Sequence, residues 1–169
     1  INVIGADGKQ SPLDINQLKM TLLQASAGLP DQIGKVAQII VETQMTIFDG
    51  IKQDDLDQAI IQVALQNIKD DPDYDKIAAR LLLKTIYNDI LGEYKDAKEL
   101  KKLHAKKFPE FINHAVEDSL LSTEMNDGRF DLKKLGEALA PEKDDLNKYL
   151  GVITNKNRYA LRKQSGSPL

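Results

Sequence analysis

The stretch that decides the fold is INVIGADGKQSPLDI, residues 1–15. Its first four residues are mostly β-branched, which favours a strand. The Asp7-Gly8 pair suits a tight turn because these residue types tolerate a positive φ. Pro12 cannot donate a backbone hydrogen bond, so the returning strand must be short. We therefore predict a β-hairpin over residues 1–13, followed by a helix with Asp14 as its N-cap.

Beyond the hairpin, apolar residues recur at helical spacing. The first predicted helix ends at Gly28 and Pro30. A second helix begins at Asp31 and continues to Asp49-Gly50. For the first helix we predict an inward face of Ile15, Leu18 and Leu22. The inward face predicted for the second comprises Ile33, Val36, Ala37, Ile40 and Val41.

Two further helices are predicted before residue 92. Asp54 or Asp55 opens the third, and Asp71-Pro72-Asp73 breaks it. The fourth has a wide apolar stripe and stops at Gly92. On this helix Arg80 is expected to pair with one of the nearby aspartates. The predicted inward residues are Leu56, Ile60, Val63, Ala64 and Ile68 on the third helix, and Ala79, Leu82, Leu83, Ile86, Tyr87 and Ile90 on the fourth.

The second half of the chain also has a helical pattern. After a lysine-rich stretch, helices are predicted from about Pro109 to Leu121, from Leu132 to Leu139 behind an Asp131 cap, and from Leu146 to Leu150 behind Asp144-Asp145. Residues 164–169 have no periodicity. The expected division is a domain over residues 1–92 and a second helical segment over residues 93–169.

Composition excludes several classes of function. The chain has 169 residues, a net charge of −3 and no cysteine, which excludes disulfides, thiolate metal sites and thiol chemistry within it. Six lysines cluster between Lys95 and Lys107, but a solvated helix face is the simpler interpretation, and no nucleic acid is expected as a partner. Neither a membrane span nor a secretory signal is recognisable, so we expect a cytoplasmic location. His104 and His114 lack partners at ligand spacing, and no metal site is predicted.

Several motifs, in a fixed order, carry a family resemblance. They are Val3-Ile4-x-x-Asp7-Gly8, Pro12-Leu13-Asp14-Ile15-x-x-Leu18, Phe48-Asp49-Gly50-Ile51 and Asp71-Pro72-Asp73-Tyr74-x-x-Ile77-Ala78-Ala79-Arg80-Leu81. A hairpin followed by four helices with these motifs resembles the ATP-cone, a module that regulates ribonucleotide reductases by binding ATP or dATP. The resemblance continues through Phe130-Asp131-Leu132-x-x-Leu135, Tyr149-Leu150-Gly151-Val152 and Asn157-Arg158-Tyr159, which are similar to the segment leading into the reductase barrel.

The resemblance implies a mainly α fold: a short N-terminal β-hairpin and four-helix cone, followed by further helices of the reductase N-terminal helical domain. It also implies a parent enzyme that reduces ribonucleotides with a cysteine thiyl radical, an ATP or dATP effector and a radical generator. A cysteine-free chain has no catalytic residue for that reaction and no cofactor of its own. The implied partners are the remainder of the reductase large chain, the radical-generating subunit and further copies in a homo-oligomer.

By resemblance, this cone lacks the cations that hold a triphosphate. The Lys-Arg pair that the family places before the Asp-Gly turn falls on Gly5 and Ala6, and a first-helix lysine falls on Gln17. The aligned nucleotide positions are Gly5, Ala6, Ser11, Gln17, Gln53, Asp57 and Asn88. Each lost charged hydrogen bond costs about 1.5–3 kcal/mol, so we expect no tight nucleotide binding. Lys9 and Lys19 are the nearest replacements, although solubilising surface lysines are the plainer interpretation.

Two alternatives stay open. The chain begins at Ile1 rather than at a methionine, so we expect a piece of a longer protein, with working cones upstream as one hypothesis. The rival hypothesis is a stand-alone helical module that kept the cone fold for protein contacts. A lone cone also occurs in a zinc-containing transcriptional repressor family, but that family needs a cysteine ribbon, and this chain has no cysteine.

Overall fold

The structure is a computed structural model that describes residues 1–163 and residue 166. Part of the aperiodic stretch 164–169 therefore lies outside the described residues. The chain divides into two compact units. The first comprises residues 1–82 with Lys148–Leu150, and the second comprises residues 83–147 with residues 151–169. The mainly α fold with a small N-terminal sheet is confirmed.

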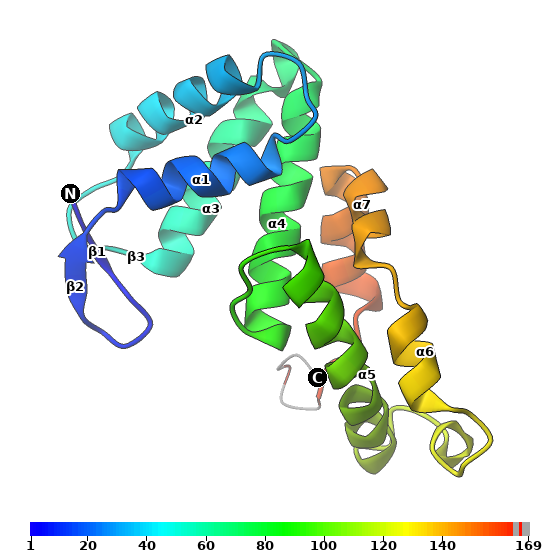
Figure 1. The fold of residues 1–169 in the computed structure, drawn as a ribbon. Helices are drawn as coiled ribbons and strands as arrows, with labels where there is room; N and C mark the ends of the chain where they lie inside the picture. The colour runs from blue at the N-terminus through cyan, green and yellow to red at the C-terminus, as the bar shows by residue number, and fades with distance from the viewer. Residues whose placement is uncertain (164–165, 167–169) are drawn as a thin grey trace. The chain divides into compact units, whose positions relative to one another are not determined.

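The first unit opens with the predicted hairpin. Strands β1 (Asn2–Ile4) and β2 (Gln10–Pro12) pair antiparallel, and Gly8 takes the positive φ of 74° that the turn requires. A third strand, β3 (Ile51–Lys52), pairs parallel with β1 in the order β2-β1-β3 (Figure 1). The sequence pattern does not predict β3, because two residues are too few to show the period of a strand.

Four helices build the core of this unit: α1 (Ile15–Ala25), α2 (Gln32–Thr46), α3 (Gln53–Gln66) with a 3-10 turn at Asn67–Lys69, and α4 (Asp73–Leu91), of which the residues up to Leu82 belong here. The predicted Asp14 cap is confirmed, since its carboxylate accepts from the Gln17 N–H at 2.9 Å. The largest fully buried apolar side chains in this unit are Leu22, Ile39, Ile61, Ile77 and Leu82.

The inward face predicted for α2 is wrong in part. Val36 is buried and Ile40 is half-buried, but Ile33, Ala37 and Val41 are exposed. The helix instead turns Lys35, Val36, Ile39 and Thr43 inward. The pattern of apolar residues favours the neighbouring stripe, because nothing in that pattern indicates that a lysine and a threonine are buried.

Lys35 is buried because it has partners at the start of α4. Its Nζ lies 2.8 Å from an Asp71 oxygen and donates to the Pro30 carbonyl at 2.6 Å. The hydrogen bond with Lys35 lowers the pKa of Asp71, and the same bond raises the pKa of Lys35 against the opposing effect of desolvation. This ion pair fixes the rotation of α2 about its own axis.

Two other expectations in this unit are wrong. Arg80 does not pair with an aspartate; its guanidinium donates to the carbonyls of Ala25 and Ala27, at 3.0 and 2.9 Å, where α1 ends. Those carbonyls have no partner within the helix, so a cation suits them. The third helix begins one residue before Asp54, so Asp54 and Asp55 lie in its first turn rather than at its N-cap.

The second unit contains α5 (Ala97–Glu117), a 3-10 turn at Thr123–Met125, α6 (Leu132–Ala138), a 3-10 segment at Pro141–Leu146, residues 151–154 of α7 (Tyr149–Thr154), and a π turn at Asn155–Tyr159. The Asp131 cap is confirmed, with its carboxylate accepting from the Lys134 N–H at 3.0 Å. The prediction that the lysine-rich stretch lies outside the helix is wrong. It forms the first half of α5, behind an Asp96 cap, and Pro109 lies inside the helix.

Pro109 and Gly136 explain how closely α5 and α6 pack. Pro109 has no N–H to offer the carbonyl of Ala105, four residues earlier. A Cβ at position 136 would lie 2.7 Å from that carbonyl oxygen and 3.3 Å from the Cβ of Phe108. Only glycine therefore allows this approach of the two helices.

Asp144 has a different role from the helix cap predicted for it. Its carboxylate accepts a hydrogen bond from the Tyr87 hydroxyl. The ring of Tyr87 meets His104 edge-on, with centroids 5.2 Å apart. Burial, together with this hydrogen bond, raises the pKa of Tyr87, and burial lowers the pKa of His104. The predicted helix over residues 146–150 is accordingly displaced: it begins at Tyr149.

The α2 assignment gives a matched test, because two isoleucines on one helix differ in exposure. Ile39 is fully buried and Ile33 is 78% exposed. We expect Ile39→Ala to lower the free energy of unfolding by about 2–5 kcal/mol and Ile33→Ala by less than about 1 kcal/mol. Urea unfolding followed by circular dichroism measures both. Equal losses would contradict the observed rotation of α2.

A second test concerns the glycine contact in the other unit. We expect Gly136→Ala to lower the free energy of unfolding by about 1–3 kcal/mol, because its Cβ would overlap backbone atoms. Gly151→Ala is the control, since a Cβ there meets its nearest atom at 3.6 Å. That change should be neutral or stabilise by up to about 1 kcal/mol. Thermal unfolding of both variants compares them, and an unaffected Gly136→Ala protein would refute the close packing.

Candidate functional site

Three of the seven aligned nucleotide positions lie on the hairpin. The Gly5 N–H donates to the Lys9 carbonyl and the Gly5 carbonyl accepts from the Gly8 N–H, each at 2.9 Å, so the turn uses both polar groups of the Gly5 backbone. Ala6 is exposed in the turn, and Ser11 is exposed on β2 opposite Val3. None of these residues carries a charge that could hold a phosphate.

Three more positions lie at the beginnings of helices. Gln17 is exposed in the first turn of α1, where Asp14 already accepts its N–H. Gln53 begins α3 and donates its side-chain amide to Asp57 at 2.9 Å. Gln53 and Asp57 are therefore brought together, as a neutral amide bound to a carboxylate. Asn88, the seventh position, is half-buried on the part of α4 that belongs to the second unit.

Sequence reasoning missed one cation in this region. Lys52 pairs with Ile4 through the parallel β1–β3 ladder. Val3 and Ile51 face the core, so the alternation of the strands turns Lys52 to the opposite, exposed face of the sheet. The Phe48-Asp49-Gly50-Ile51 motif marks this place, but only the strand pairing shows that Lys52 lies beside the hairpin.

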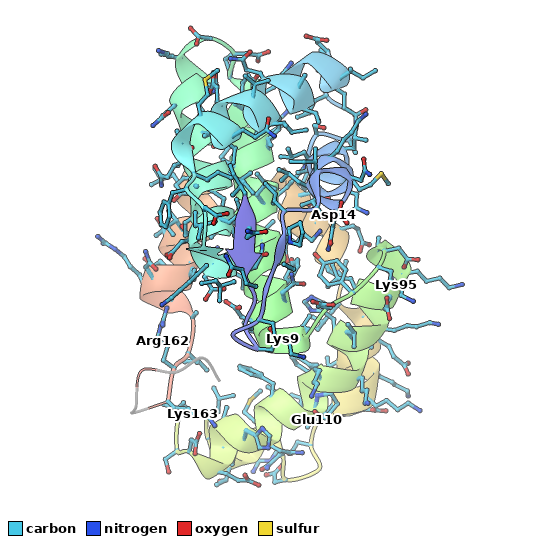
Figure 2. The ribbon with its side chains drawn as sticks, turned by 90° about the vertical axis from the view of Figure 1, so that its left-hand side faces the viewer. Lys9, Asp14, Lys95, Glu110, Arg162 and Lys163 are labelled. Atoms are coloured by element: carbon cyan, nitrogen blue, oxygen red, sulfur yellow. The ribbon has the colours of Figure 1, made fainter. Side chains whose placement is uncertain are left out.

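Lys9 is a weak substitute for the family's cations. Figure 2 shows it at the tip of the hairpin, and Asp14 where the chain enters α1. The side chain of Lys9 is 86% exposed, and the Lys9 Nζ lies 3.5 Å from an Asp7 oxygen. A solvated lysine that already faces a carboxylate adds little to phosphate binding.

The charges of the surrounding segments oppose an anion. Residues 1–20 and 47–60 contain three lysines (Lys9, Lys19, Lys52) and six aspartates (Asp7, Asp14, Asp49, Asp54, Asp55, Asp57), so their side-chain charge is 3 − 6 = −3. A nucleoside triphosphate bears several negative charges and needs cations or free N–H groups around it. The side chains of these two segments therefore supply more negative than positive charge.

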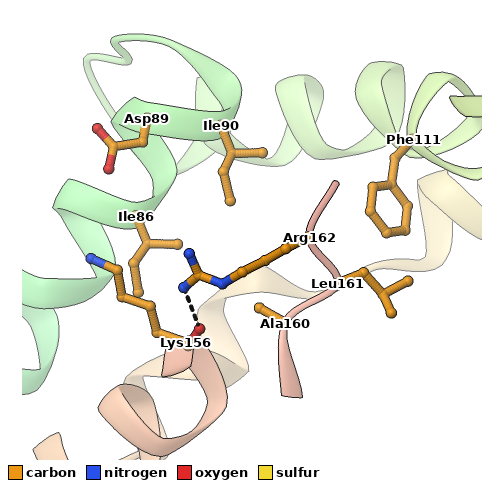
Figure 3. A pocket seen from close by; sticks show the side chains of 8 residues that line it. All are labelled: Ile86, Asp89, Ile90, Phe111, Lys156, Ala160, Leu161 and Arg162. Atoms are coloured by element: carbon orange, nitrogen blue, oxygen red, sulfur yellow. Dashed lines mark hydrogen bonds between the residues drawn. The ribbon is translucent and has the colours of Figure 1, made fainter. Parts of the chain in front are cut away.

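The second unit holds a cavity of about 240 Å³, lined mainly by apolar groups (Figure 3). Its residues come from α4, α5 and the last described segment: Ile86, Asp89, Ile90, Phe111, Lys156, Ala160, Leu161 and Arg162. The Arg162 guanidinium donates to the Lys156 carbonyl at 2.9 Å and to the Gly166 carbonyl at 3.3 Å. Both of these bonds engage the Arg162 guanidinium with backbone carbonyls, and the remaining charged residues of the lining are Asp89 and Lys156.

Among residues 1–163 and 166, no group of three or more acidic or histidine side chains has the arrangement of a metal site. Within the same residues, no helix combines the length and apolar character needed to cross a bilayer.

The fold and the aligned positions together define a small helical domain closed by an N-terminal hairpin. The family model of the ATP cone domain matches residues 1–89. The chain therefore belongs to the ATP-cone family.

The curated relatives are ribonucleoside-diphosphate reductase alpha subunits. The subunit from Chlamydia pneumoniae is 36% identical over 115 residues, covering 68% of this chain and 11% of the relative. The subunit from Chlamydia trachomatis is 29% identical over 160 residues, covering 94% and 15%. The Helicobacter pylori subunit is 27% identical over 172 residues, covering 100% and 20%. The chain thus spans one fifth or less of the length of these relatives.

Proposed function

We propose that this chain is the N-terminal regulatory and structural portion of a ribonucleoside-diphosphate reductase large subunit. The observation that carries the proposal is the combination of an ATP-cone over residues 1–89 with similarity to reductase alpha subunits over the whole chain. On this proposal, residues 1–92 form the cone-like domain and residues 93–169 begin the helical domain. The remainder of the large chain is its first partner, and the radical-generating subunit and further copies of the large chain assemble with it.

The chain alone is not the enzyme. Reduction by a thiyl radical requires sulfur, and this sequence contains no cysteine. It therefore contributes packing surfaces and regulation, and the catalytic residues belong to the remainder of the parent protein. As part of such a reductase, the chain is proposed to act in the cytoplasm.

The cone of this chain does not hold ATP or dATP tightly. The support is local: the aligned positions offer small or neutral side chains and one carboxylate, Asp57, to which Gln53 already donates. The nearest lysines, Lys9 and Lys52, are exposed. Without two or three of the charged hydrogen bonds that a triphosphate needs, binding weakens by several kcal/mol, at about 1.5–3 kcal/mol each.

The rival function is a stand-alone helical module for protein contacts. The exposed apolar residues of α2 are the observation in its favour. The complete reading frame distinguishes the two functions. Barrel sequence with cysteines, either downstream or in a neighbouring gene, supports the reductase, and a stop codon with no such partner supports the module.

Nucleotide titration tests the degenerate site. We expect isothermal calorimetry of the 169-residue chain with ATP, and separately with dATP, to show no saturable heat below about 1 mM, because the region has a net negative charge. Micromolar binding of either nucleotide would show that other groups hold the phosphates. It would leave the assignment to a reductase intact.

Restoring two cations tests whether their absence is what weakens nucleotide binding. We expect the double variant Ala6→Arg with Gln17→Lys to bind dATP roughly 100-fold or more tightly than the parent, as two charged hydrogen bonds imply. Gly5 is left unchanged because a Cβ there would lie 3.1 Å from the Asp7 carboxylate. The control, Gln62→Lys with Gln66→Arg, makes the same charge change at exposed positions of α3. A restored variant that binds no better than this control would disprove the cation explanation.

A further inference from the structure

The side chain of His104, on α5 in the second unit, has a buried ring nitrogen without a partner. Its Nε2 is shielded from solvent and forms no hydrogen bond with any residue that the structure describes. Most buried polar atoms in folded proteins are hydrogen-bonded, so this exception calls for an explanation. Histidine is also the side chain whose charge changes near neutral pH.

The ring of His104 belongs to a cluster that joins three segments of the second unit. The ring of Tyr87 on α4 meets it edge-on, with centroids 5.2 Å apart. The Tyr87 hydroxyl donates to the Asp144 carboxylate in the 3-10 segment Pro141–Leu146. Tyr94 lies edge-on to Tyr87, with centroids 6.2 Å apart. We call Tyr87, Tyr94, His104 and Asp144 the His104 cluster.

Two opposing effects act on a proton at His104. The Asp144 carboxylate attracts the imidazolium, but desolvation opposes it more strongly, so the pKa of His104 lies below its ordinary value. On α5 itself, Lys101 and Lys107 lie three residues to either side, and a cation between them meets like charges. The cluster therefore suits the neutral ring.

The other charged groups near the cluster act elsewhere or face solvent. Asp145 acts on Tyr87 and Tyr94. Lys84 lies one turn before Tyr87 on α4 and is half-buried. The remaining charged residues on α4 of this unit, on α6 and in the 3-10 segments packed against α5 are exposed: Asp89, Glu124, Lys133, Lys134, Glu137, Glu142 and Lys143.

We propose that His104 makes the second unit sensitive to acid, because uptake of a proton by its imidazole loosens the packing of Pro141–Leu146 on α4 and α5. An imidazolium has a second N–H donor and a full charge, and both require water or an acceptor. Asp144 already accepts from Tyr87, and burial raises the pKa of Tyr87, so that hydroxyl keeps its proton. Water reaches the charged ring when the segment that shields it moves away. This inference goes beyond the proposed function and does not depend on it.

The direction of the effect follows from the two states of the segment. In the packed state His104 binds a proton less readily than in the open state, where water reaches the ring. Stability that is present above the ordinary imidazole pKa of about 6.5 is therefore lost as the pH falls below it. Between pH 8 and pH 5.5 the opening equilibrium shifts by at most about 10-fold, the limit for a ring that takes up no proton when packed.

Hydrogen exchange of the 169-residue chain at about pH 8 and about pH 5.5 measures this opening. The amides of Lys143 and Asn147 report on the segment, because they donate to the carbonyls of Ala140 and Asp144, each at 3.0 Å. We expect their protection, corrected for the intrinsic exchange rate, to fall by about 3- to 10-fold on acidification. Protection that stays constant or rises overturns the proposal.

Two variants without a titrating ring test whether His104 is the cause. His104→Gln should abolish the fall in protection, and so should His104→Phe, which keeps a ring against Tyr87. The matched control is His114→Gln, an exposed position on the same helix, which should keep the fall. Circular dichroism confirms that each variant is folded. A fall in protection that persists in both His104 variants refutes the proposal.

The ring signals of His104 in a nuclear magnetic resonance titration decide the matter in the unmodified chain. We expect a midpoint below about 6.5. Asp144→Asn should lower the midpoint further, because it removes the attraction for the imidazolium and keeps an oxygen that accepts from Tyr87. A purely structural Asp144 would not move the midpoint in this direction. A midpoint at or above the ordinary value would show that the packed cluster favours the imidazolium, and the proposal would then be wrong.

Discussion

The parallel pairing of β1 with β3 is the constraint on which the first unit depends. Two ladder positions, Val3 with Ile51 and Ile4 with Lys52, join the first residues of the chain to the entry of α3. The Gly50 N–H and the Asn2 carbonyl add a bond of 2.9 Å, and the Asn2 N–H donates to Asp49 at 2.6 Å. Two helices and their connections lie between these strands in sequence. The pairing therefore sets where the hairpin and the N-terminus of α3 meet, which is where a cone places its phosphate ligands by resemblance.

That constraint explains which features of the chain can change without loss of the fold. Val3 and Ile51 are buried and hold the strands against the core. The aligned positions Ala6, Ser11 and Gln17 are exposed, and no buried contact requires a cation there. Replacing exposed basic residues by neutral ones leaves the packing almost untouched, because surface substitutions rarely change stability by more than about 0.5 kcal/mol. A cone can therefore keep its architecture with neutral residues at these positions.

Local sequence signals predicted the elements well but not their partners. Asp-Gly at residues 7–8 and the Asp14 cap are short-range features, and the structure has both as expected. Long-range features could not be predicted from the sequence. Strand β3 is too short to show a period, and Asp71 is too far from Lys35 in sequence for their ion pair to be recognised. The predicted start of a helix at Pro109 is wrong because it also relied on a local signal. A proline usually marks a helix start, but here α5 accommodates it in its interior. The aligned nucleotide positions were identified by resemblance alone. Lys52 is recognised as a cation near them only from the pairing of β1 with β3.

The error on α2 is informative beyond its own residues. Apolar periodicity predicts that the stripe with Ile33, Ala37 and Val41 faces the core, yet the neighbouring stripe with Lys35 and Thr43 does so. Asp71 makes burial of the lysine possible, and the same rotation turns Ile33, Val41 and Met45 outward. Exposing these apolar side chains to water has a cost in solvation free energy. The buried charge and the outward apolar face are thus two consequences of one rotation of α2.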